Sequence, residues 1–163
     1  MPHHSAPNLS ARRAAASDRV AVVYARLALG AAFLSGVADR FGLWGDKSGW
    51  KTFADFERYT AQVNSFMPPA TIPVLAWAAT VAELSFGLAL VVGFRVRWAA
   101  LGSAVLLTLF GAAMAVSFGI KSPLDYSVFS AAAGALLLAL HASPVREPPS
   151  GGAPGHPAVT SDP

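Results

Sequence analysis

The stretch that decides the fold covers residues 72–119 and reads IPVLAWAATVAELSFGLALVVGF, then RVR, then WAALGSAVLLTLFGAAMAVSFG. Each apolar run has close to the ~20 residues that a helix needs to cross the hydrocarbon core of a bilayer. An unpaired backbone group in hydrocarbon costs several kcal/mol, so such runs must form helices rather than open strands. Because only Arg95-Val96-Arg97 separates the runs, we expect the two helices to form an antiparallel hairpin.

Two more apolar runs lie outside this hairpin, at approximately Val20–Ala38 and Asp125–His141. Of the 163 residues, 54% are hydrophobic and 13% are charged, with a mean hydropathy of +0.48. A soluble domain normally carries about 25% charged residues. The sequence therefore predicts an all-α integral membrane four-helix bundle over residues 19–142. The polar residues 1–18 and the Pro-, Gly- and Ser-rich residues 143–163 are expected to be disordered tails.

The basic residues indicate an orientation. Arg12, Arg13 and Arg19 precede the first run, and Arg95 and Arg97 lie in the hairpin turn. Lys and Arg favour the cytoplasmic side of membrane helices, so we expect a multi-pass protein of the inner (plasma) membrane with both termini cytoplasmic. A second set of basic residues falls on the other side: Arg40, Lys47, Lys51, Arg58 and Lys121. No basic stripe with interleaved aromatic residues exists, so nucleic acid is not an expected partner.

The long connection after the first run carries aromatic residues with near-helical spacing, among them Trp50, Phe53, Phe56 and Tyr59. Charged residues separate them, which is typical of an amphipathic helix lying in the membrane interface, with Trp and Tyr at headgroup level. Two interpretations stay open: a plug that caps the bundle from outside, or a lid over a lipid-facing cavity.

Two ionisable residues interrupt the apolar runs, Arg26 and Glu83. Such a residue costs about 2.5–3.5 kcal/mol on insertion scales and is therefore expected to be paired or functional. At about 1.5 Å per residue, Arg26 lies roughly 10 Å and Glu83 roughly 16 Å from the same membrane face. This predicts an Arg26–Glu83 ion pair. The pair would fix the helix register, or line a pocket for a polar headgroup such as a quinone ring or an anion; a third alternative leaves the groups unpaired, for instance with Glu83 protonated.

Small residues flank both charges, and such residues mark faces where membrane helices approach closely. We expect this face to contain Gly30, Gly36, Ala79 and Gly87. Both charges should therefore point into the bundle.

Several kinds of site are missing from the sequence. The chain has no cysteine, which excludes thiol relays, iron–sulfur ligation and cysteine nucleophiles. It has no nucleotide-binding glycine loop, no H-E-x-x-H motif and no serine elbow, and its histidines form no ligand cluster. We expect no complete catalytic site, no metal site and no covalently bound cofactor.

Five segments carry a resemblance to a known family: Arg26–Gly30 (RLALG), Phe33–Gly36 (FLSG), Val63–Pro68 (VNSFMP), Glu83–Arg95 (ELSFGLALVVGFR) and Ile120–Ser127 (IKSPLDYS). In this order they resemble the DoxX family. The resemblance implies a four-span membrane protein. It also implies a similarity to the small subunits of archaeal thiosulfate:quinone oxidoreductase, which pass electrons to a membrane quinone.

From the resemblance and the buried charges we derive a leading hypothesis, an accessory or quinone-interacting subunit of a membrane oxidoreductase system. The expected partners are the lipid bilayer and an oxidoreductase, with a homo-oligomer left open. The alternatives are a membrane scaffold or assembly protein without ligand chemistry, and a small-solute or lipid transporter. The missing cysteines argue against a thiol-based redox role.

Overall fold

The structure is a computed structural model that describes residues 9–142. Its elements are helices and short turns: α1 (Leu9–Arg40), η1 (Gly45–Lys47), α2 (Phe53–Val63), η2 (Pro69–Thr71), α3 (Ile72–Val92), α4 (Val96–Phe118), α5 (Lys121–Asp125) and α6 (Val128–His141). No strand occurs within this described part of the chain. The predicted all-α fold is confirmed.

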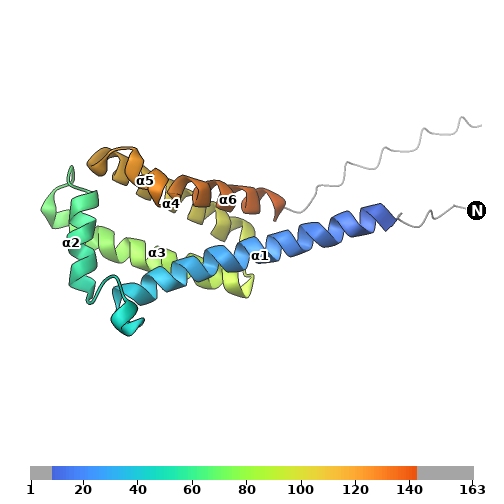
Figure 1. Cartoon of the computed structure of the whole chain (residues 1–163), viewed down its shortest axis with the longest axis horizontal. Helices are drawn as coiled ribbons and strands as arrows, with labels where there is room; N and C mark the ends of the chain where they lie inside the picture. Colours follow the sequence, from blue (N-terminus) through green and yellow to red (C-terminus); the bar gives the residue numbers. More distant parts are fainter. Residues whose placement is uncertain (1–8, 143–163) are drawn as a thin grey trace, which may run out of the picture.

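Four helices form the bundle. Helix α1 packs against α3, α3 against α4, α4 against α6, and α6 against α1. Three of these, α1, α3 and α4, are long and apolar enough to cross a membrane. Helix α6 has 14 residues, about 21 Å at 1.5 Å per residue, and is a shorter apolar helix. The start of α1 and the end of α6 lie at the same end of the bundle (Figure 1).

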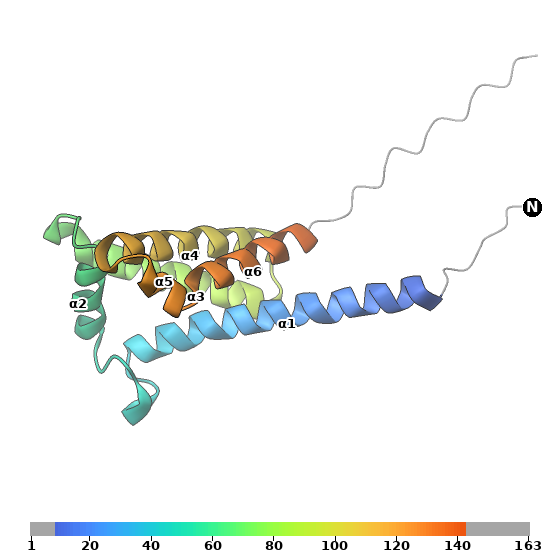
Figure 2. The ribbon, with the colours of Figure 1, turned by 45° about the horizontal axis from the view of Figure 1, so that its top comes forward.

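Two predicted boundaries are wrong. Helix α1 begins at Leu9, so residues 9–18 are helical where a disordered tail was expected, and this segment projects beyond the bundle (Figure 2). The fourth helix was expected from Asp125, but α5 ends there and α6 begins only at Val128. Ser127 separates the two helices with a left-handed backbone, φ 55°. The remaining tail predictions concern residues 1–8 and 143–163, which lie outside the described part of the chain.

Glycines bring α1 and α3 together in the half of the bundle nearer the α3–α4 turn. A Cβ on Gly30 would lie 3.0 Å from the carbonyl oxygen of Gly87 and 2.8 Å from a methyl group of Val91. A Cβ on Gly87 would lie 3.2 Å from the carbonyl oxygen of Gly30. Only glycine allows this approach, as expected of small residues between membrane helices.

Helices α3 and α4 form the predicted hairpin. Gly93 ends α3 with φ 85°, and Arg95 precedes α4 with φ 44°. Near this turn the Phe86 ring lies directly on Gly102, 2.4 Å from where a Cβ would be. The two helices are therefore in close contact at this end.

Helix α2 lies across the opposite end of the bundle (Figure 1). It begins with a capping box: the Thr52 hydroxyl accepts from the Asp55 amide, and the Asp55 carboxylate accepts from the Thr52 amide. Its C-terminal end is held by Ser117, whose hydroxyl donates to the Val63 carbonyl over 2.5 Å. An amphipathic helix in the first connection is therefore present, as the aromatic spacing predicted.

A roofed cavity with a buried ion pair

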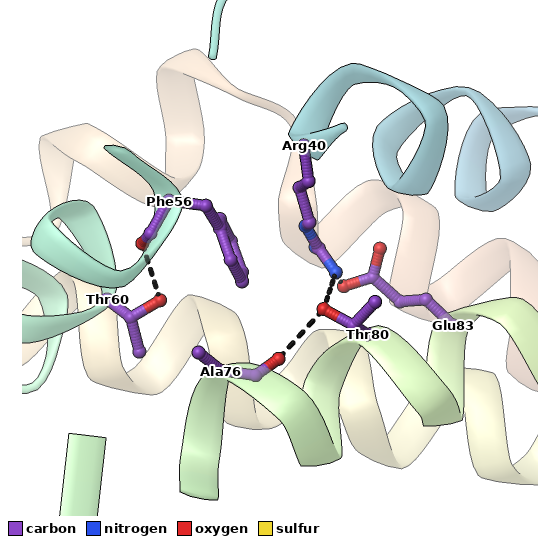
Figure 3. Close-up of polar contacts among 6 residues, drawn as sticks. All are labelled: Arg40, Phe56, Thr60, Ala76, Thr80 and Glu83. Carbon is purple, nitrogen blue, oxygen red and sulfur yellow. Dashed lines mark hydrogen bonds and ion pairs between the residues drawn. The ribbon is translucent and has the colours of Figure 1, made fainter. Parts of the chain in front are cut away.

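Glu83 is buried in α3, 4% exposed, and its partner is Arg40 at the end of α1. Nη2 of Arg40 lies 2.5 Å from Oε1 of Glu83 (Figure 3). Nη1 of Arg40 donates to the Thr80 hydroxyl over 2.9 Å, and Thr80 in turn donates to the Ala76 carbonyl. These contacts join the end of α1 to two turns of α3 and neutralise both buried charges.

The predicted Arg26–Glu83 pair is wrong. Arg26 lies at the other end of the bundle, where its Nη1 is 2.6 Å from the position of a Cβ on Gly93. The antiparallel register places Gly30 opposite Gly87, so Arg26 is opposite the end of α3 and Glu83 is opposite Gly36. The predicted depths are wrong because Val20 does not mark the membrane boundary: α1 continues well beyond the bundle at that end (Figure 2).

The residues around Arg26 are typical of the membrane interface. Tyr24, Phe94 and Trp98 are exposed at the same end, and such aromatic residues are typical of headgroup level. From Trp98 to Phe118 α4 rises roughly 30 Å at 1.5 Å per residue, the thickness of the hydrocarbon core. Arg26 thus lies near the interface, and its Nε atom is buried without a hydrogen bond.

Helix α1 ends at Arg40, whereas α3 extends two further turns beyond Thr80, to Ile72. Helix α4 also continues, to Phe118. Beyond Arg40, α1 therefore leaves space beside α3 and α4, and α2 lies across it. The result is a cavity of about 540 Å³. Protein interiors rarely contain voids larger than a water molecule, whereas ligand pockets measure about 300–1,000 Å³.

The walls of the cavity, formed by α3 and α4, are apolar. Its few polar groups lie at the floor, where α1 ends at Arg40, and at the roof, which α2 and the residues beside it form. The lining residues come from four parts of the chain: Gly36 and Arg40 of α1; Trp50, Phe56, Tyr59, Thr60, Val63 and Asn64 in and around α2; Leu75, Ala78, Ala79 and Ala82 of α3; and Leu106, Leu109, Phe110, Ala113 and Met114 of α4. Ala79 and Gly36 of the predicted small-residue face thus line a void, while Gly30 and Gly87 form a helix contact.

The four predicted lid aromatics divide into two groups. Trp50, Phe56 and Tyr59 line the cavity. Phe53 packs away from it, against Trp77 at 4.4 Å and Phe41 at 5.6 Å between ring centroids. Helix α2 is therefore anchored by one aromatic side chain and contributes two to the roof, and Trp50 from the segment before α2 adds a third.

Phe56 links the roof to the ion pair. Its ring lies over the Arg40 guanidinium, with 3.8 Å between Cζ and the ring centroid. In Figure 3 the ring projects from α2 toward Arg40 and the α3 helix. The attraction between cation and ring is worth about 2 kcal/mol when desolvated, so the position of α2 depends on Arg40.

Hydrogen-bonding groups are available to a ligand inside the cavity. An arginine carries five N–H donors, and the contacts to Glu83 and Thr80 engage Nη2 and Nη1. Burial raises the pKa of the Tyr59 phenol above its ordinary value, with a smaller contribution from Tyr126. Tyr59 is therefore a hydroxyl at neutral pH and can donate to an oxygen acceptor.

Sequence reasoning missed Arg40, because it lies just beyond the first apolar run, in the segment predicted to connect the first two spans. A signal was present: Arg40 follows Gly36 by one helical turn and Phe33 by two, so it shares their buried face. The described residues contain no group of three or more His, Cys, Asp or Glu side chains that could hold a metal ion.

Comparison with known proteins agrees with this architecture. The model of one family, DoxX, matches residues 21–118, the region from α1 through α4. No curated protein and no solved structure matches the chain. On this match and on its apolar helical bundle, the chain belongs to the DoxX family of membrane proteins.

Proposed function

We propose that this protein binds the headgroup of a membrane quinone beneath α2, as an accessory subunit of a quinone-linked oxidoreductase system. The observation that carries the proposal is the position of Arg40 in the floor of a largely apolar cavity of about 540 Å³. That volume suits one ring with its substituents.

The charge at the cavity floor favours a neutral ligand. Glu83 lies 2.5 Å from Arg40 and compensates its charge, so an anionic headgroup would also meet the carboxylate. A quinone is neutral and carries carbonyl oxygens, which accept hydrogen bonds from the guanidinium and from the Tyr59 hydroxyl. Its flat ring also suits the aromatic roof of Trp50, Phe56 and Tyr59.

The basic residues support the proposed orientation. Arg13, Arg19, Arg95 and Arg97 are exposed at the end where α1 starts and α6 finishes. At the cavity end, Arg40 is buried and paired with Glu83, and four further basic residues are exposed: Lys47, Lys51, Arg58 and Lys121. We place the first end in the cytoplasm on the arginines that precede the first span and form the α3–α4 turn, which puts the cavity toward the outer face of the inner membrane.

Binding of a short-chain benzoquinone by the purified protein in nanodiscs tests the proposal. The Arg40→Gln/Glu83→Gln double variant removes both charges together, so no buried ion remains unpaired, and Tyr59→Phe removes one hydroxyl. We expect both to weaken binding at least about tenfold, the effect of one or two lost hydrogen bonds. Arg26→Gln serves as the matched control and should bind like the parent. No saturable binding by the parent, or parental affinity in the double variant, would refute the proposal.

A scaffolding role is the second candidate, supported by the exposed arginines on α1 and on the α3–α4 turn. It predicts that Arg95→Glu/Arg97→Glu releases a co-purifying oxidoreductase, while Arg40→Gln/Glu83→Gln retains it.

A further inference from the structure

The cavity has an opening on one side of the bundle. Ala78 of α3 and Leu109 of α4 line it, yet both are exposed on the outer surface, Leu109 by 61%. A residue that both lines a cavity and faces the outside lies at its rim. Helix α6 contributes no lining residue, and α1 covers the inner side of α3. The opening therefore lies between α3 and α4.

This opening faces lipid. The outer surfaces of α3 and α4 beside it carry exposed apolar residues, among them Val74, Val81, Val105 and Val116. Both helices are long and apolar enough to cross the membrane. An apolar passage at this level would contact acyl chains rather than water.

The polar and apolar parts of the cavity are separated. Arg40 lies at the inner floor and Tyr59 and Asn64 at the roof, whereas the rim is formed by Ala78, Leu109 and their apolar neighbours. A ligand that satisfies both regions has a polar head inside and an apolar chain at the rim.

We infer that the cavity selects ligands with a long apolar chain, which enter from the bilayer and leave their chain between α3 and α4. This inference rests on the proposed headgroup site and adds the ligand class and the route. The width of the passage depends on the alanines of α3 that line it, Ala78, Ala79 and Ala82. A larger side chain at the rim would exclude the apolar chain of the ligand without touching Arg40.

The test compares two probes in nanodiscs: a benzoquinone with a long prenyl chain and the same headgroup with a methyl group in its place. Ala78→Phe narrows the rim from α3, and Leu109→Trp narrows it from α4. If one of these variants fails to fold, the other still tests the inference. Ala133→Phe is the matched control, because Ala133 is an exposed alanine of α6 that does not line the cavity. Each variant is compared with the parent for the same probe, so membrane partitioning of the probe cancels.

We expect Ala78→Phe and Leu109→Trp to weaken binding of the prenylated probe about tenfold, because the larger side chain and the prenyl chain would compete for the same space at the rim. Binding of the chain-free probe should change less than about twofold, and Ala133→Phe should change neither. Equal effects on the two probes, or no effect on either, would overturn the inference while the headgroup site stands. Failure of both probes to bind the parent would instead refute the proposed function, and the inference with it.

Discussion

The two ends of the bundle are built differently although the same helices form them. At the hairpin end, Gly30 packs on Gly87 and Phe86 on Gly102, so the helices are in direct contact. At the α2 end, α1 stops at Arg40 while α3 and α4 continue, and a cavity of about 540 Å³ remains. The cavity therefore arises because α1 ends earlier than α3 and α4 at this end of the bundle, with one buried ion pair at the point where α1 ends.

The largest expected effect separates the two arginines of α1. Arg40→Ala leaves Glu83 buried without its partner, and breaking a buried pair in this way costs about 3–5 kcal/mol. Arg26→Ala leaves no carboxylate without its partner and should cost clearly less, about 1 kcal/mol as for an ordinary substitution. Reversible unfolding in mixed micelles measures the free energy of unfolding of both variants. Equal losses of unfolding free energy in the two variants would mean that the two ends do not differ as described.

The closely packed end should resist even one added methyl group. In Gly30→Ala the new Cβ would meet the Gly87 backbone at 3.0 Å, and overpacking of this kind costs about 1–3 kcal/mol. Gly134→Ala is the matched control in α6, because nothing lies within 4 Å of its Cβ. It should stabilise the protein by up to ~1 kcal/mol through helix propensity. If the two variants changed the free energy of unfolding in the same direction, the close packing of α1 on α3 would be contradicted.

The roof should loosen when its contact with the ion pair is removed. Phe56→Leu keeps an apolar side chain but loses the ring over Arg40, a contact worth about 0.5–2 kcal/mol. We expect faster hydrogen exchange across α2 with little change in α3 and α4. Phe66→Leu, at an exposed phenylalanine beyond α2, is the control. Unchanged exchange in Phe56→Leu would show that Arg40 does not hold the roof.

The smallest effect concerns the start of α2 and depends on pH. Hydrogen bonds from the Thr52 side chain and backbone, with a contribution from Arg58, hold the pKa of Asp55 below its ordinary value of 3.8. The capping box therefore contributes its full stability above that value and loses it as the pH falls through the lower, folded-state pKa. Amide protection at the start of α2 should be constant from about pH 7 to 4 and fall below that range. Asp55→Asn should abolish this dependence, and a transition near neutral pH would contradict the assignment.

Much of the fold could be predicted because the bilayer restricts the choices. Long apolar runs must be helices, and the turn around Arg95 allows only a hairpin, so α3 and α4 were predicted to within two residues at most of their ends. The break at Ser127 was missed because an αL residue other than glycine leaves no pattern in an apolar run.

The candidate site was only half predictable. Glu83 was found because a carboxylate within an apolar run needs a partner. Its partner was misassigned, since the sequence gives the order of residues along each helix but not the axial register between neighbouring helices. The Gly30–Gly87 contact sets the register of α1 against α3, and it does so by packing rather than by the distance of each residue from the membrane surface.

The most direct test of the account is a double-mutant cycle for the partner of Glu83, measured by unfolding in mixed micelles. The cycle of Arg40→Gln with Glu83→Gln should give a coupling free energy above about 1 kcal/mol, as expected of groups in direct contact. The cycle of Arg26→Gln with Glu83→Gln should give less than about 0.5 kcal/mol, as for independent sites. Strong coupling of Glu83 to Arg26, or none to Arg40, would contradict the ion pair on which the cavity floor depends.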